Sequence, residues 1–158
     1  MTIKTGIGQD SHAFEKTPGK PLILGGITIN NKTGLSGNSD ADVVLHSITN
    51  AISSVTGINI IGSIADELCQ KGITDSRVYL ERALKDIGQY NINHIAIAIE
   101  CLIPKISPYI EAIKQNIADL CGININDIGI TATTGEGLTA FGKGEGVQAI
   151  TIITLSKK

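Results

Sequence analysis

Apolar and polar residues recur along this chain with two different periods, which predict five strands and three helices. Strands are expected at residues 3–14, 22–29, 93–103, 127–134 and 146–155, the second of them bent or bulged at a glycine pair. Helices are expected after an N-cap at Ser39 or Asp40, from Thr74 to near Gly88, and from Ser107–Pro108 to Gly122. Residues 57–74 have no clear period and are predicted to form a loop.

The order of these elements predicts a single α+β domain over residues 1–158, with a four- to five-stranded mixed sheet and helices on one face. Isoleucine and alanine alternate in the run from Ile95 to Ile99, so both faces of this strand are apolar. A sheet face of this kind is too apolar to remain in water. The chain is therefore expected to form a homo-oligomer.

Composition and charge exclude several classes of partner. The net charge of -2 and the pI near 5.9 give no broad basic field, and only 3% of residues are aromatic, so no nucleic acid partner is expected. The cysteines Cys69, Cys101 and Cys121 are widely spaced, which favours neither a disulfide framework nor a thiolate zinc site. No signal pattern or membrane-spanning run is present. A cytoplasmic location without a membrane partner is the expectation.

Two histidines and one carboxylate form a candidate metal set. On the helix that follows residue 39, His46 lies opposite the apolar stripe, where it is either solvated or a metal ligand. Asp10 and His12 share one face of the first strand and either pair with each other or converge on one ion. The three side chains together suit zinc and leave a fourth position open. The free N–H groups at residues 38–40 would attract a phosphate beside that ion.

The glycine-spaced segment from Thr133 to Gly146 is a candidate phosphate site. Its glycines let the main chain approach a phosphate closely, and Glu136 could hold a magnesium ion shared with phosphate oxygens. The residue order of a P-loop is missing. A tight turn with ordinary surface residues explains the same composition and is the more common case.

The whole chain resembles the 2-C-methyl-D-erythritol 2,4-cyclodiphosphate synthase family. The segments that match the family's motifs, in chain order, are Asp10-Ser11-His12, Asn38-Ser39-Asp40-Ala41-Asp42-Val43 with His46, Asp75-Ser76-Arg77, Pro104-Lys105, Ala132-Thr133-Thr134 with Glu136, and Gly142-Lys143-Gly144-Glu145-Gly146. Together these matches are highly specific.

The resemblance implies a homotrimer with active sites between subunits and a cytidine diphosphate substrate. Zn²⁺ would be bound by Asp10, His12 and His46, and Mg²⁺ or Mn²⁺ by Glu136 with the substrate diphosphate. Residues 101–107 and 132–134 would form the cytosine and phosphate pocket, contributed by the neighbouring subunit. The implied reaction is an intramolecular phosphoryl transfer: the 2-phosphate of a cytidine diphosphate methylerythritol attacks the β-phosphorus, expels CMP and closes a cyclic diphosphate.

By the same resemblance, Thr134 and Lys105 are the candidate catalytic residues. The candidate substrate-binding residues are Asp10, Ser11, His12, Asn38, Ser39, Gly62, Cys101, Pro104, Lys105, Ile106, Ala132, Thr133, Thr134, Gly135, Glu136 and Lys143.

The match departs from the family mainly at residues that read the substrate. Asn38 replaces a histidine, Ile60 replaces the aspartate of an Asp-x-Gly, and Lys143 replaces an arginine. The family's Phe-Pro-Asp-Thr-Asp loop is replaced by a shorter segment around residues 64–68. These departures leave two alternatives to the family's reaction: a trimeric zinc enzyme acting on another phosphorylated or nucleotide substrate, and a non-catalytic ligand-binding paralogue.

Overall fold

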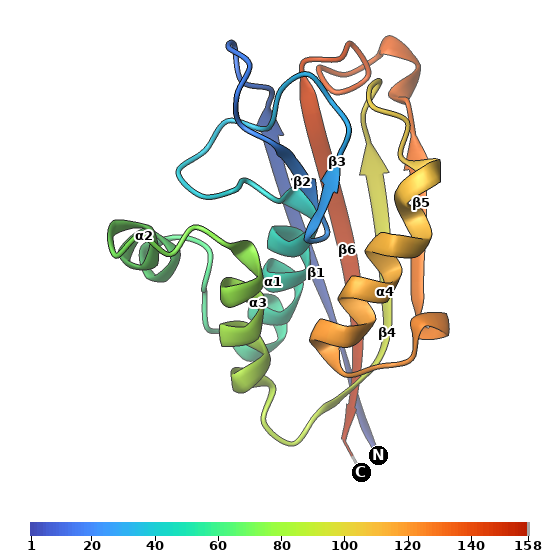
Figure 1. The fold of residues 1–158 in the computed structure, drawn as a ribbon. Helices are drawn as coiled ribbons and strands as arrows, with labels where there is room; N and C mark the ends of the chain where they lie inside the picture. The colour runs from blue at the N-terminus through green and yellow to red at the C-terminus, as the bar shows by residue number, and fades with distance from the viewer. Residues whose placement is uncertain (158) are drawn as a thin grey trace.

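A computed structural model describes residues 1–157 of the chain and contains a four-stranded mixed sheet (Figure 1). The strands are β1 (Thr2–Ala13), β4 (Asn91–Glu100), β5 (Ile128–Thr133) and β6 (Gly146–Lys157). Their order is β1-β6-β4-β5, in which β6 runs antiparallel to both of its neighbours and β4 runs parallel to β5. This arrangement confirms the predicted α+β class and the lower of the two predicted strand numbers.

The helices cover one face of this sheet (Figure 1). Helix α1 (Val43–Thr56) packs on β1 and β6, and α4 (Ile110–Cys121) packs on β5. Helix α3 (Ser76–Leu84) packs on α1, and the short α2 (Ser63–Gln70) projects beside them. A separate hairpin consists of β2 (Leu22–Leu24) and β3 (Ile27–Ile29). The 3-10 turns are η1 (Lys85–Ile87), η2 (Ser107–Tyr109), η3 (Ile125–Asp127) and η4 (Gly135–Gly137).

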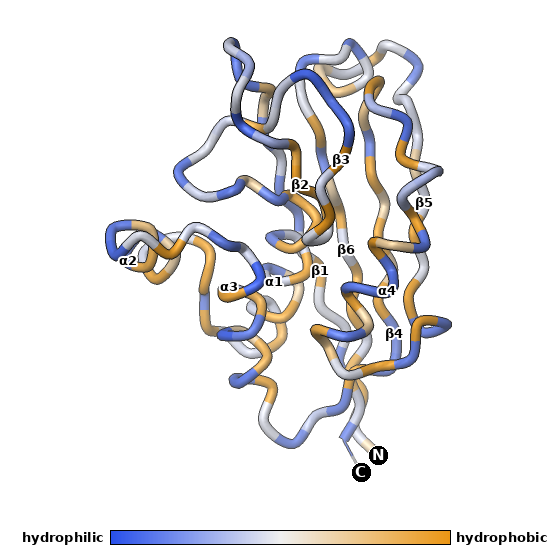
Figure 2. Tube along the Cα trace, in the orientation of Figure 1, coloured by the Kyte–Doolittle hydropathy of each residue, from blue (hydrophilic) through white to orange (hydrophobic). Residues whose placement is uncertain are grey.

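Side chains of β6 alternate between an apolar core and the opposite face of the sheet. The buried positions are Val147, Ala149, Thr151, Ile153 and Leu155. Between them, Ile150 and Ile152 point away from the helices and are exposed. Apolar positions recur along all four strands (Figure 2), and the uncovered face also exposes 58% of Ile3 and 62% of Ile7. The predicted apolar outer face is therefore present.

Helix α1 lies unusually close to β1 because the strand has glycine where the two elements meet. A Cβ atom on Gly8 would collide with the backbone of Ser47 and Ala51, and one on Gly6 with the Ala51 carbonyl. Both glycines occupy inward positions of β1 and are buried. Asp10 and His12 occupy the next two inward positions, so the same approach brings α1 against them.

Two of the predicted local structures are wrong. Residues 22–29 form a hairpin rather than one strand, because Gly25 and Gly26 have φ values of 60° and 76° and reverse the chain in a two-residue turn. Residues 57–74, predicted to be a loop, contain α2. This helix begins after Gly62 without a side-chain cap and buries only Ala65, so its sequence gave no clear start signal.

The helix N-caps also differ from the predictions. Asp42 caps α1 instead of Ser39 or Asp40, because Ala41 has a φ of 57° and the helix can begin only after it. Asp75, not Thr74, caps α3.

At the next helix, the turn η2 occupies the predicted start, so α4 begins later and has no side-chain cap from Ser107. Its predicted end at Gly122, in the left-handed conformation, is confirmed, and Gly88 likewise follows η1 with a positive φ.

The contact between α1 and β1 can be tested by adding one methyl group. Gly8→Ala should lower the free energy of unfolding by about 1–3 kcal/mol, because backbone atoms of α1 would have to move. The measurement is chemical denaturation. Gly129→Ala is the matched control, since its added Cβ would meet only the His94 ring at 3.8 Å. Equal stability of the two variants would show that α1 does not depend on this approach.

Candidate active site

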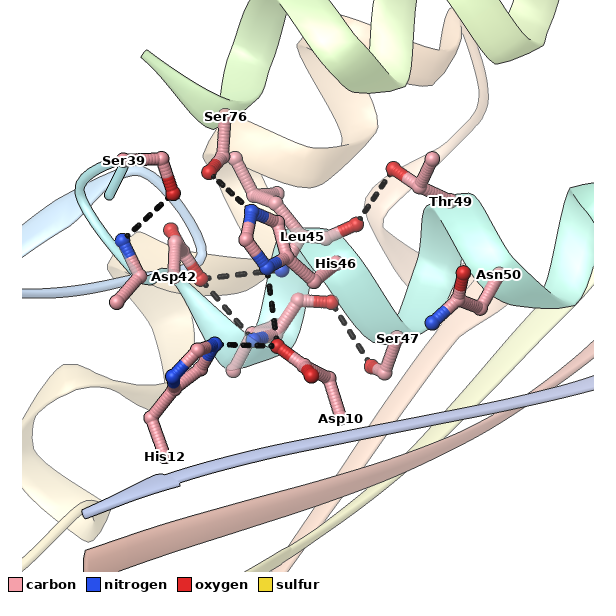
Figure 3. Close-up of polar contacts among 12 residues, drawn as sticks. Asp10, His12, Ser39, Asp42, Leu45, His46, Ser47, Thr49, Asn50 and Ser76 are labelled. Atoms are coloured by element: carbon pink, nitrogen blue, oxygen red, sulfur yellow. Dashed lines mark hydrogen bonds and ion pairs between the residues drawn. The ribbon is translucent and has the colours of Figure 1, made fainter. Parts of the chain in front are cut away.

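Asp10 and His12 from β1 and His46 from α1 converge on one point (Figure 3). The Oδ2 atom of Asp10 lies 2.9 Å from His46 Nδ1 and 3.3 Å from His12 Nε2. One ligand atom from each residue lies within 4.8 Å of the others. The alternative in which Asp10 and His12 only pair with each other is therefore wrong, because His46 joins them.

His46 is buried, with only 5% of the residue exposed, so the solvated reading is also wrong. A helical wheel places it opposite the apolar stripe, but α1 is covered on both sides. The polar side of the helix faces β1 and α3. Here the His46 ring packs against the Tyr79 ring with 5.9 Å between centroids.

The start of α1 is fixed by the buried carboxylate of Asp42. It accepts N–H groups from Val44 and Leu45 at the helix end. It also accepts those of Gly25 and Gly26 in the β2-β3 turn, at 2.9 and 2.6 Å. Burial raises the pKa of Asp42 to about 6, although these four donors favour its charged form. One side chain thus ties the hairpin to the helix that carries His46.

The charges of the cluster suit a cation. Burial opposes ionisation of Asp10, but hydrogen bonds and charges from His12 and His46 outweigh it and lower the pKa of Asp10 to about 2. The hydrogen bond to Asp10 raises the pKa of His12. Asp10 is thus an anion at neutral pH, and two imidazoles lie against it.

This donor set fits zinc. Two imidazole nitrogens and one carboxylate oxygen from the protein, with a fourth position left open, are typical of catalytic zinc sites. The three ligands border a cavity of about 230 Å³. The other residues that line it are Asn38, Ser39, Ile61, Gly62, Ala65, Asp66, Cys69 and Tyr79. Asn38 and Ser39 thus lie near the metal set, as predicted, and Gly62 lines the same cavity.

The residues that depart from the family's pattern lie in different places relative to this cavity. Ile60 is completely buried in the core, so it leaves the neighbouring Gly62 as the cavity residue of that motif. Helix α2, through Ala65, Asp66 and Cys69, forms a wall of the same cavity. This wall was not predicted, because residues 57–74 have no clear helical period. Ser11 lies on the opposite face of β1 from Asp10 and His12.

A second cavity, of about 290 Å³, lies where β4 and β5 end. These strands are parallel neighbours, so the segments that follow them meet at one edge. Its lining residues are Cys101, Leu102, Pro104, Lys105, Ile106, Ser107, Ala132, Thr133 and Thr134. The structure thus brings together the two segments that the family resemblance implied to form one pocket. Burial raises the pKa of the Cys101 thiol to about 11, which keeps it protonated.

The loop after β5 carries the remaining candidates. Glu136 is exposed, has a φ of 53° and lies outside the metal cluster. Gly135 packs against the carboxylate of Glu100, which accepts the hydroxyl of Thr139. The Thr139 oxygen in turn accepts the N–H of Gly142 at 2.9 Å. Lys143 is exposed on the same loop.

Comparison with known proteins decides the family. A model described as the YgbB family matches residues 3–156. The chain belongs to the YgbB family. A 2-C-methyl-D-erythritol 2,4-cyclodiphosphate synthase of Chlamydia caviae is 48% identical over 157 residues, which cover 98% of this chain and 89% of that protein. The synthase of Chlamydia trachomatis serovar D is 49% identical over 156 residues, which cover 96% of this chain and 87% of that protein.

Solved structures of similar proteins have the same fold. The bifunctional IspDF of Campylobacter jejuni superposes with a TM-score of 0.88 and 31% identity, covering 99% of this chain and 43% of that one. A 2C-methyl-D-erythritol-2,4-cyclodiphosphate synthase in its CDP-bound form has a TM-score of 0.86 and 28% identity, covering 97% of this chain and all of that one. A CDP complex of Plasmodium falciparum IspF has a TM-score of 0.85 and 28% identity, and the match covers 99% of this chain and 97% of that one.

The pairing of His12 with Asp10 predicts that the melting temperature depends on pH, and that it changes in opposite directions with and without zinc. The pKa of His12 is raised from 6.5 on folding, so its contribution to stability is complete below that value and is lost as pH rises through the folded pKa. Without metal, the melting temperature should therefore fall from about pH 6 to about pH 8. With zinc it should rise over the same range, because protons compete with the metal. His12→Asn should flatten both slopes, and unchanged slopes would contradict this assignment.

Proposed function

We propose that this chain is a 2-C-methyl-D-erythritol 2,4-cyclodiphosphate synthase, a lyase of isoprenoid biosynthesis. In the reaction, an oxygen of the substrate's 2-phosphate bonds to the β-phosphorus while the bond from that phosphorus to CMP breaks. The products are the cyclic diphosphate and CMP. The convergence of Asp10, His12 and His46 beside a cavity of about 230 Å³ carries the proposal, together with relatives of that name over almost the full chain.

Asp10, His12 and His46 would hold zinc, which supplies positive charge to the diphosphate when bound. Asn38 and Ser39, which line the same cavity, would hydrogen-bond phosphate oxygens through their side chains. The expected phosphate site on free N–H groups at residues 38–40 is wrong, because α1 begins later, its first N–H groups donate to Asp42, and the N–H of Asp40 donates to Thr74. Glu136 would hold Mg²⁺ or Mn²⁺ together with the substrate diphosphate. The protein needs no nucleophile, so its part is to align the two phosphates and balance their charge.

The cavity at the ends of β4 and β5 would take the cytidine end of the substrate. The CDP complexes of two similar structures support a cytidine nucleotide as ligand. Lys105, exposed at the rim, would neutralise phosphate charge, and the Thr134 hydroxyl would orient the scissile diphosphate. Cys101, Pro104, Ile106, Ala132 and Thr133 would enclose the base.

The two cavities belong to opposite edges of the sheet, which supports active sites between subunits. β1 and β5 are the edge strands, three strand spacings or about 14 Å apart. The apolar outer face, with Ile3, Ile7, Ile150 and Ile152 exposed, would be buried in a homotrimer. A neighbouring subunit could then place its β4-β5 cavity beside the metal set.

The metal centre is tested by removing its buried ligand. His46→Ala should lower CMP release from the cytidine diphosphate methylerythritol 2-phosphate substrate by at least about 100-fold, with magnesium and the same total zinc concentration present for both proteins. Asp119→Ala is the control, because this exposed residue of α4 lies outside the metal cluster and lines neither cavity, so the variant should keep full activity. Absence of CMP release by the wild-type chain at every metal loading would refute the proposed reaction.

The assembly is tested on the outer face. Ile152→Lys should convert the trimer to monomers, because an unpaired charge would be buried at the interface. Sedimentation equilibrium measures the mass, and Thr28→Lys on the exposed hairpin is the control. A wild-type chain that sediments as a monomer would contradict the homotrimer.

One observation favours a second candidate. Helix α2 walls the metal cavity where the family's pattern has a different loop, so a trimeric zinc enzyme of this fold could select another phosphorylated or nucleotide substrate. A substrate screen in which methylerythritol compounds are turned over best would exclude it.

A further inference from the structure

The ring of His46 is held on both sides, and only one side belongs to the metal cluster. Its Nδ1 atom faces Asp10, while its Nε2 atom lies 2.7 Å from the hydroxyl oxygen of Ser76 (Figure 3). Ser76 is the first residue of α3 and is completely buried. Behind it lies Asp40, which accepts the N–H of Ser76 at 2.9 Å and its hydroxyl in a second hydrogen bond.

The directions of these hydrogen bonds follow from how many protons each group has. An ionised carboxylate only accepts, so the single hydroxyl proton of Ser76 is donated to Asp40. The Ser76 oxygen then has only lone pairs left for His46. The hydrogen bond between them therefore requires the proton to be on Nε2 of His46. Nδ1 is the remaining nitrogen, and it points at Asp10, to which it donates a hydrogen bond when no metal is bound. Zinc would take the place of that Nδ1 proton, while the Nε2 proton stays with Ser76.

We propose that Ser76 and Asp40 are positioning residues of the metal centre, which hold the proton of His46 on Nε2 and thereby present Nδ1 to the ion. A hydrogen bond to the far nitrogen of a ligating histidine fixes both its tautomer and its ring orientation. Tyr79, also from α3, restrains the ring by packing against it. Helix α3 thus supports the centre without supplying a ligand. The inference rests on the proposed zinc site.

A purely structural role for the same contacts makes a different prediction. Asp40 also receives the N–H of Asp42 at 3.2 Å, and its own N–H donates to Thr74, so it joins the segment before α1 to α3. If Ser76 and Asp40 only linked these two segments, removing the Ser76 hydroxyl would change the melting temperature. It would leave the zinc affinity and the position of the His46 proton unchanged.

The test compares zinc affinities of the full chain by competition with a chromogenic chelator. Ser76→Ala should bind zinc about 10–100-fold more weakly than the wild type, and Ser76→Thr, which keeps the hydroxyl, should recover most of the loss. Ser53→Ala is the matched control, because Ser53 is a buried serine of α1 whose hydroxyl has no partner among the described residues. It should bind zinc like the wild type.

A second readout locates the proton directly. In the zinc-bound protein labelled with ¹⁵N-histidine, NMR should place a slowly exchanging proton on Nε2 of His46 and the metal on Nδ1. Ser76→Ala should make that proton exchange rapidly. If Ser76→Ala does not fold, zinc affinity and the position of the histidine proton are measured on Asp40→Asn instead. This variant should bind zinc several-fold more weakly, because the group that accepts the Ser76 hydroxyl loses its charge.

The outcomes separate this inference from the proposed function. A Ser76→Ala protein that folds and binds zinc within about twofold of the wild type, or a metal found on Nε2, overturns the positioning role alone. Zinc binding that depends on Ser76 without any CMP release supports the positioning role and refutes the proposed reaction. A wild-type chain that does not bind zinc overturns both.

Discussion

The close packing of helix α1 on two glycines of β1 is the constraint on which the candidate site depends. Gly6 and Gly8 leave no side chain between strand and helix, so the helix backbone rests on the strand itself. Asp10 continues the same inward row, and at this separation its carboxylate reaches the Nδ1 atom of His46. A wider gap of the kind that ordinary side chains produce would leave the two groups too far apart to share one ion.

Much of this arrangement could be predicted from the sequence, because it depends on periods and on residue chemistry. Strand alternation placed Asp10 and His12 on one face. The segments around Lys105 and Thr134 were paired only by the family resemblance, and the parallel order of β4 and β5 that brings them together was not predicted. The apolar outer face followed from the isoleucine and alanine pattern. The trimer, the roles of individual site residues and the cytoplasmic location remain predictions.

The features that could not be predicted are tertiary in origin. No local pattern indicates that Asp42 is fully buried, since the Gly25 and Gly26 donors come from a distant turn. His46 lies on a polar helix side that only the packing of β1 and α3 covers. Helix α2 is short and uncapped and buries only Ala65, so its sequence resembles that of a loop. The link from Ser76 to His46 joins residues 30 positions apart.

The strand β1 has a consequence for how this chain can vary in length. Its inward residues contact α1 and form the metal cluster, while Ile3 and Ile7, which point to the other side, form part of the apolar outer face. Because the side-chain period is two, inserting or deleting one residue before Asp10 would turn both sets to the wrong faces at once. Changes of length in this family are therefore expected in segments such as residues 57–62 and not in β1, whose register sets both the metal cluster and the apolar outer face.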